Sequence, residues 1–224
     1  MMSRFSIDTH SKKTIALVTL FAIAMAFVES SVVVYLREIY YQDGFTFPLV
    51  SMKQELILVE LLREAATIIM LGCIGVLSAK SFWQRFAYFL IAFGVWDIFY
   101  YVWLKALLNW PLTLFDWDIL FLIPLPWIGP VIAPVIISLL MMICGWMILS
   151  LEQSSQRFRP TPLSYTLTII GATCILFSFM RDTDATTRFQ YPQVYWYWLL
   201  AVGLFLGAVG FSHAYIRSAS RDNR

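Results

Sequence analysis

Residues 14–36, TIALVTLFAIAMAFVESSVVVYL, form a predominantly apolar segment in which Glu29 is the one charged side chain. A helix of this length is about 35 Å long, which is enough to cross the roughly 30 Å hydrocarbon core of a bilayer. The apolar run continues to Leu36 without a polar cleavage region, so we expect a membrane span and not a removed leader. This segment predicts that the chain is inserted in a membrane.

Similar apolar segments recur along the remaining sequence. Sixty per cent of the 224 residues are hydrophobic and 13% are charged, a composition typical of a polytopic membrane protein and not of a soluble one. We therefore expect an all-α transmembrane helical bundle with about six spans, five to seven at the limits, in a single membrane domain over residues 1–224. The expected spans are 14–36, 56–79, 86–108, 128–150, 163–180 and 195–216.

Lysine and arginine are unevenly distributed over the segments that join these spans. With both termini in the cytoplasm, ten of these side chains fall on the inner side and five on the outer side. Cytoplasmic loops carry the excess of basic residues, so this distribution predicts that both termini are cytoplasmic. A basic inner rim is usual beside anionic lipids, and it gives no indication of a nucleic-acid partner. The expected partners are membrane lipids.

Ionisable side chains inside the expected spans are the main indication of function. A charge at the centre of a spanning helix costs about 2.5 to 3.5 kcal/mol on insertion scales, so it is usually offset by a partner, water or a bound ion. Counting from the outer end of each helix places Glu29, Glu60, Glu64 and Asp97 at depths of roughly 10, 6, 12 and 16 Å. The single guanidinium of Arg63 pairs well with only one or two of these four carboxylates.

The spacing of these residues predicts shared helix faces. Glu60, Arg63 and Glu64 are three and four residues apart, so they project from one side of their helix. Tyr100 and Tyr101 follow Asp97 by three and four residues, which brings two phenols near its carboxylate as expected donors. A purely structural alternative is an ion-pair cluster at 60–64 that only holds helices together.

We expect a buried acidic pocket that opens to the extracytoplasmic side and binds a cation or exchanges protons. Its binding groups would be Glu29, Glu60, Glu64 and Asp97, with Arg63 orienting the carboxylates. Carboxylates and phenols without histidine suit a hard divalent cation, so the same four residues are the candidate metal ligands.

Haem and zinc are not expected at this pocket. These groups usually draw on histidine, cysteine or methionine ligands, and the two histidines, His10 and His213, both fall on the predicted cytoplasmic side. Neither histidine reaches carboxylates in the outer leaflet. The sequence thus indicates an oxygen-donor site.

The segment before the fourth expected span is rich in proline. Residues 120–134, LFLIPLPWIGPVIAP, contain four prolines, which remove backbone donors and disfavour helix in the preceding residue. We expect a broken or re-entrant segment here, with a vestibule beside the acidic layer. Asp116 and Asp118 are expected at the outer surface, where they would cap a short helix, collect cations or be solvated.

Four stretches together resemble a group of uncharacterised bacterial multi-pass membrane proteins. The resemblance covers the first four expected helices and implies a bacterial inner-membrane location, with no activity or functional residue attached to it. The stretches are AMAFVESSVVVYLREIYY at 24–41, ELLREAATIIM at 60–70, FGVWDIFYYVWLK at 93–105 and WDILFLIPLPWIGPVIAP at 117–134.

Two other classes of function remain open from the sequence. The first is an accessory or structural subunit of a membrane complex, or a homo-oligomer, because Gly203 and Gly207 form a GxxxG spacing that permits close helix approach. The second is an enzyme acting on a lipid or lipid-linked substrate at the outer leaflet. In that enzyme a carboxylate would be the general acid or base, and Arg63 would hold an anionic head group.

Overall fold

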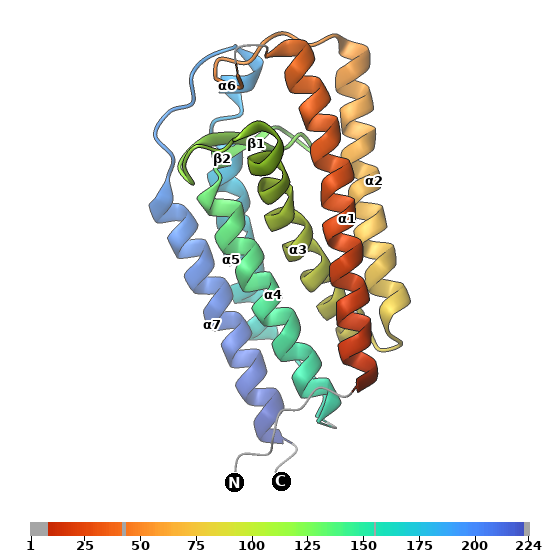
Figure 1. Cartoon of the computed structure of the whole chain (residues 1–224). Coiled ribbons are helices and arrows are strands. Elements are labelled where there is room, and N and C mark those ends of the chain that lie inside the picture. The colour runs from red at the N-terminus through yellow and green to blue at the C-terminus, as the bar shows by residue number, and fades with distance from the viewer. Residues whose placement is uncertain (1–8, 42–43, 155, 222–224) are drawn as a thin grey trace.

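The computed structural model of this protein describes residues 9–41, 44–154 and 156–221. Six long helices run roughly along one direction, and a short helix and a β-hairpin lie toward one end (Figure 1). The elements are α1 (Thr9–Tyr40), α2 (Gln54–Ser78), α3 (Phe82–Leu108), β1 (Trp117–Phe121), β2 (Trp127–Pro130), α4 (Ile132–Gln153), α5 (Pro162–Met180), α6 (Asp184–Thr187) and α7 (Tyr197–Arg221).

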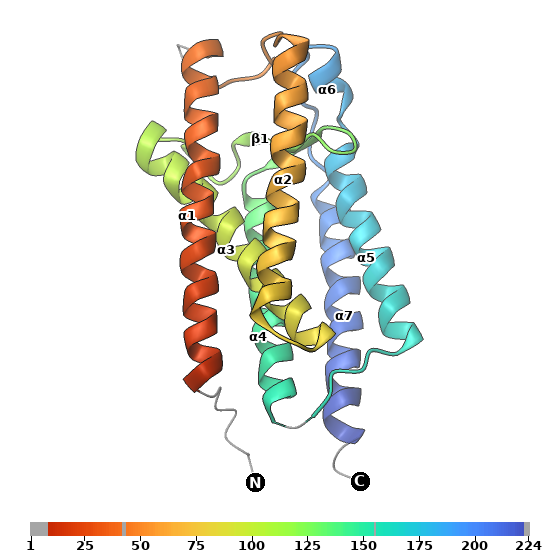
Figure 2. The same cartoon turned by 90° about the vertical axis from the view of Figure 1, so that its right-hand side faces the viewer.

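Helix α3 is the centre of one half of the bundle, where it packs against α1, α2 and α4. Helices α5 and α7 pack on each other and form the opposite side (Figure 2). The main apolar core joins the two halves, with Leu71 of α2, Ile91 of α3 and Ile148 of α4 among its buried members. Leu77, Ile169 and Phe205 instead point outward and are exposed. Apolar side chains on both the inner and the outer faces are typical of a membrane bundle.

Five segments of the described chain are long and apolar enough to cross a membrane. They are Ser11–Tyr40, Phe82–Leu108, Ile132–Gln153, Pro162–Thr187 and Tyr197–Ser220. A multi-pass membrane bundle is thus supported. Helix α2, which carries Glu60, Arg63 and Glu64, is not among the five.

The proline-rich segment folds as an antiparallel hairpin, a form that the sequence analysis did not foresee. Strand β1 pairs with β2, with Trp117 opposite Pro130 and Ile119 opposite Ile128. Because residues 127–130 are in a strand, α4 begins at Ile132 and not near 128 as expected. The hairpin lies between the upper parts of α1 and α2 and the end of α5 (Figure 1).

Glycines at 171, 203 and 210 set the distance between α5 and α7, and a Cβ on Gly210 would overlap Ser164 and Thr168. A Cβ on Gly171 would overlap the backbone of Gly203 and Gly207, and a Cβ on Gly203 would overlap Gly171 and Ile175. A Cβ on Gly207 would meet nothing within 4 Å. Gly203 of the GxxxG motif therefore serves the packing of α7 on α5 within this chain, and its close approach needs no second molecule.

Candidate functional site

A cavity of about 450 Å³ lies at the end of the bundle away from the start of α1 and the end of α7. Helices α1, α2 and α3, strand β1 and the loops around residues 45–52 and 186–189 surround it. Five carboxylic residues and two arginines line it together with aromatic side chains. The charged residues are Glu29, Glu60, Glu64, Asp97, Asp118, Arg37 and Arg63.

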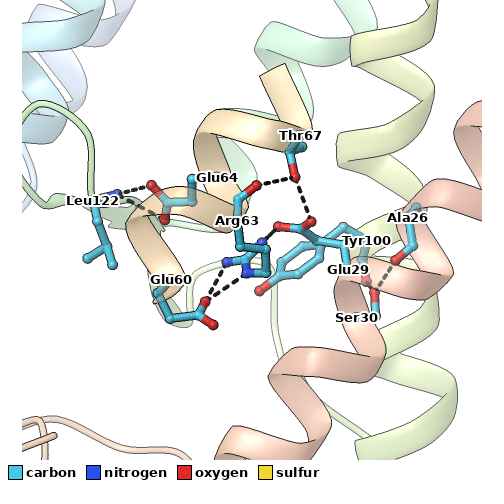
Figure 3. Close-up of polar contacts among 9 residues, drawn as sticks. All are labelled: Ala26, Glu29, Ser30, Glu60, Arg63, Glu64, Thr67, Tyr100 and Leu122. Carbon is cyan, nitrogen blue, oxygen red and sulfur yellow. Dashed lines mark hydrogen bonds and ion pairs between the residues drawn. The ribbon is translucent and has the colours of Figure 1, made fainter. Parts of the chain in front are cut away.

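Arg63 joins two of these carboxylates. Its guanidinium forms an ion pair with Glu29 of α1, and its Nε and Nη2 lie 2.8 and 2.7 Å from Oε2 of Glu60 (Figure 3). The second oxygen of Glu29 accepts a hydrogen bond of 3.0 Å from Thr67 Oγ1. Glu60 and Thr67 are buried on the same face of α2 as Arg63. Glu60 precedes Arg63 by three residues, and Thr67 follows it by four. The spacing predicted from the sequence thus produces one connected cluster across α1 and α2.

Glu64 has a different role, because it contacts the hairpin. Both of its carboxylate oxygens accept from the backbone N–H of Leu122, at 3.1 and 2.8 Å (Figure 3). Leu122 follows β1 directly, so this contact fixes the hairpin against α2. Glu64 lines the cavity without an ion pair to a guanidinium in the part of the chain that the structure describes.

Asp97 is held by a serine and not by the two tyrosines expected from the sequence. Ser138 Oγ of α4 donates to Asp97 Oδ2 at 2.8 Å. Tyr100 and Tyr101 line the cavity, but neither phenol forms a hydrogen bond with Asp97 among the described contacts. The reason is that a side chain three or four residues further along a helix shares a face without necessarily reaching the same atom, whereas Ser138 approaches from the neighbouring helix.

Arg37 and Asp118 form a second charged pair in the cavity. Their Nη2 and Oδ1 atoms are 3.5 Å apart, and both residues are buried. The guanidinium carbon lies 3.8 Å from the ring centroid of Trp110 and 4.3 Å from that of Phe45, and these two rings are nearly perpendicular to each other. Asp118 was expected at the outer surface, but β1 turns it inward, next to Arg37 and close to Tyr101. Burial raises the pKa of Asp118 to about 6, and Arg37 opposes this rise.

Asp116 takes no part in the cavity. Its carboxylate accepts from the backbone N–H of Leu112 at 2.7 Å and from Thr113 Oγ1 at 2.7 Å, so it fixes the turn before the hairpin. Of the residues expected at the site, Glu29, Glu60, Arg63, Glu64 and Asp97 do line one cavity, as do the supporting residues Tyr100, Tyr101 and Asp118.

Sequence analysis missed Arg37 and Ser138. Arg37 was assigned to an outer loop because the first span was ended at Leu36, whereas α1 continues to Tyr40. The spacing of Glu29, Val33 and Arg37 at four-residue intervals was the signal that they share one face of a longer helix. Ser138 gave no comparable signal, since its contact depends on how α3 and α4 pack.

The carboxylates are not gathered as a metal site. Within residues 9–41, 44–154 and 156–221, no three histidine, cysteine, aspartate or glutamate side chains lie close enough to hold a metal ion. The cavity carboxylates are instead engaged by protein donors: Arg63 pairs with Glu29 and Glu60, and Leu122, Ser138 and Arg37 contact Glu64, Asp97 and Asp118 respectively. His213 lies at the other end of the bundle, where its Nδ1 is 2.9 Å from Ser164 Oγ. The side chain of His10 is outside the described residues.

Comparisons of the chain with protein-family models, curated proteins and solved structures give no match. The assignment of a function therefore depends on the chemistry of the cavity.

Proposed function

We propose that this chain is an integral membrane protein that binds a cationic solute, or the protons that take its place, at the carboxylates of the cavity. The role would be binding or transport. The observation that carries the proposal is the charge ratio in the cavity, where five carboxyl groups face two guanidinium groups. Ionised carboxylates in excess of the available cations are costly in a low-dielectric environment, and a cation or a proton offsets that cost.

An organic cation suits the lining better than a divalent metal. Phe45, Trp96, Tyr100 and Phe121 line the cavity beside the carboxylates, and aromatic faces attract alkylammonium groups. Glu64 and Asp97 receive neutral hydrogen-bond donors, so their charge is not paired directly with an arginine. A volume of about 450 Å³ is within the range of small-molecule pockets.

The bundle has a direction that suits uptake from outside. Lys12 and Lys13 lie in the first turns of α1, and Arg217 and Arg221 lie in the last turns of α7, so these four basic residues are at the end of the bundle away from the cavity. The positive-inside rule then supports a cavity that opens to the extracytoplasmic side with a cytoplasmic start of α1. We extend this orientation to α2 as a sixth crossing, since its 25 residues are about 37 Å long.

Binding is tested by calorimetry on the detergent-solubilised full chain with tetramethylammonium, ethanolamine and sodium ions as separate probes. Proton uptake or release is followed in weak buffer in the same titrations. We expect wild-type protein to bind an organic cation and the Asp97→Asn and Glu60→Gln variants to bind it roughly tenfold or more weakly. Asp184→Asn is the matched control, because Asp184 is exposed and outside the cavity.

Two results would overturn the proposal. One is equal binding by the wild type and both cavity variants. The other is a folded wild-type protein that binds none of the three cations and exchanges no protons between about pH 5 and 8, where buried carboxyl groups titrate.

A further inference from the structure

Arg37 lies in the cavity with hydrogen-bond donors that the protein does not use. The residue is 7% exposed, and its Nε and Nη1 atoms have no hydrogen-bond partner among the described residues. Its contact with Asp118, at 3.5 Å, is long for a charge-assisted hydrogen bond. The phenol of Tyr101 lies close to the Asp118 carboxylate, whose Oδ2 atom is buried and has no hydrogen bond of ordinary length in the described chain. Buried guanidinium groups are normally satisfied by acceptors, so this arrangement points to a ligand oxygen.

Stacking determines where such an acceptor binds. Trp110 and Phe45 lie on two adjacent sides of the Arg37 guanidinium, with their rings nearly perpendicular to each other, so the N–H donors on its remaining sides are open to a partner. The edge of a guanidinium presents parallel N–H groups that match the two oxygens of a carboxylate or a phosphate. The rings also hold the group in place. Arg37 is therefore a preorganised oxyanion site in a cavity that is otherwise acidic.

Asp97 of α3 lines the same cavity as this pair. Asp97 lies within electrostatic range of Asp118, which is the partner of Arg37. Tyr100 lines the cavity together with Arg37, Asp97 and Asp118. Asp97 uses Oδ2 to accept from Ser138, and Oδ1 forms no hydrogen bond among the described contacts. The free oxygen of Asp97 and the unpaired donors of Arg37 thus belong to residues that line one cavity, so a single ligand with two opposite charges can be matched to both.

We propose that the cavity binds a zwitterion, with a carboxylate or phosphate oxyanion at Arg37 and an ammonium group at Asp97. This inference rests on the proposed function, because the ammonium group is the cation of that proposal. A lipid head group and a soluble solute have the same chemistry here. A lipid head group and a soluble solute can both enter the cavity, because its lining residues Val50, Ile57 and Phe189 are also exposed at the surface.

The test uses three soluble probes that share parts of one structure. Glycerophosphoethanolamine has both charges, ethanolamine has only the ammonium group and glycerol phosphate has only the anion. We expect the zwitterion to bind the detergent-solubilised full chain roughly 10- to 100-fold more tightly than either part. Arg37→Lys should remove this advantage, because a lysine retains the charge beside Asp118 but lacks the planar fork.

Arg181→Lys is the matched control. Arg181 is also stacked on a ring, 4.1 Å above Trp196, but it lies outside the cavity. We expect its variant to bind the zwitterion like the wild type. If Arg37→Lys does not fold, a competition between the three probes on the wild type still decides the matter, since only a two-ended site prefers the zwitterion to both parts.

Each other outcome has a definite meaning. Equal affinity for ethanolamine and the zwitterion overturns the inference and leaves the cation proposal intact. Equal affinity for glycerol phosphate and the zwitterion overturns both. Binding in nanodiscs distinguishes a lipid head group from a soluble solute as the natural ligand. Weaker binding of the soluble zwitterion in phosphatidylethanolamine nanodiscs than in phosphatidylglycerol nanodiscs supports a lipid head group. Unchanged binding supports a soluble solute.

Discussion

Arg63 of α2 is ion-paired with Glu29 of α1 and, one turn away on its own helix, with Glu60. Helices α1 and α2 are separated in Figure 2, and this cluster is a polar link between them within an apolar bundle. All three side chains are mostly buried, the guanidinium at 21% exposed. The pairs are therefore poorly screened, and the loss of the arginine would leave two carboxylates without a counter-ion.

Replacing Arg63 should destabilise the protein more than replacing an exposed arginine. We expect Arg63→Gln to lower the free energy of unfolding by about 3 kcal/mol, because an uncompensated buried charge remains. Arg188→Gln is the control, since Arg188 pairs with Asp184 at the surface and such pairs contribute about 0 to 1 kcal/mol. Chemical unfolding in detergent measures both variants. Similar losses in the two variants would show that the Arg63 cluster is solvated.

Glu64 should control the order of the hairpin. Glu64→Leu removes the acceptor of the Leu122 N–H, whereas Glu64→Gln retains an acceptor oxygen. We therefore expect faster hydrogen exchange over residues 117–130 in the leucine variant and near wild-type exchange in the glutamine variant. Hydrogen exchange with mass spectrometry on the full chain measures this. Equal protection in all three proteins would mean that the hairpin is fixed by its apolar contacts alone.

The glycines of α5 and α7 should differ in their tolerance of a methyl group. A Cβ on Gly171 or Gly203 would overlap the facing helix, so we expect each alanine variant to lose about 1 to 3 kcal/mol of stability. Gly207→Ala has open space and gains helix propensity, so it should be neutral or slightly stabilising. Thermal unfolding monitored by tryptophan fluorescence compares the three. A loss in Gly207→Ala alone would indicate that this position contacts a partner molecule.

Helix positions could be predicted because crossing a bilayer needs a minimum length of apolar sequence. The expected fifth span, 163–180, differs from α5 by one residue at its start, and the expected third span ends with α3 at residue 108. The local spacing of Glu60, Arg63 and Glu64 also placed them correctly on one face. These features depend only on helix geometry, which the sequence encodes locally.

The hairpin and the contacts between helices could not be predicted in the same way. Proline excludes helix from residues 124–130 but does not specify β-pairing, which depends on Trp117 meeting Pro130. Pairing turned Asp118 inward, so an aspartate expected in solvent became a partner of Arg37. Ser138 reaches Asp97 only because α3 and α4 pack closely. Such contacts are tertiary, and no local pattern reports them.

The pH dependence of stability should carry a contribution from Asp118. Burial raises its pKa from 3.8 to about 6, so the folded protein retains this proton to a higher pH than the unfolded chain does. The stabilisation from Asp118 is therefore fully present below its pKa in the unfolded chain, 3.8. It is lost as the pH rises through its pKa in the folded protein, about 6. Asp118→Asn cannot ionise. The stability of the variant relative to the wild type should therefore increase between pH 4 and 6 and stay constant above that range.

Comparing the two proteins isolates this group, because the other cavity carboxyls are present in both. Melting temperatures at pH 4, 5, 6 and 7 give the trend, and Asp184→Asn, at an exposed position, should show none. The opposite trend, with the wild type gaining on Asp118→Asn as the pH rises, would mean that the ion pair with Arg37 outweighs burial. An ionised Asp118 would then compete with a ligand oxyanion for Arg37, so the sign of this one slope also bears on the zwitterion site.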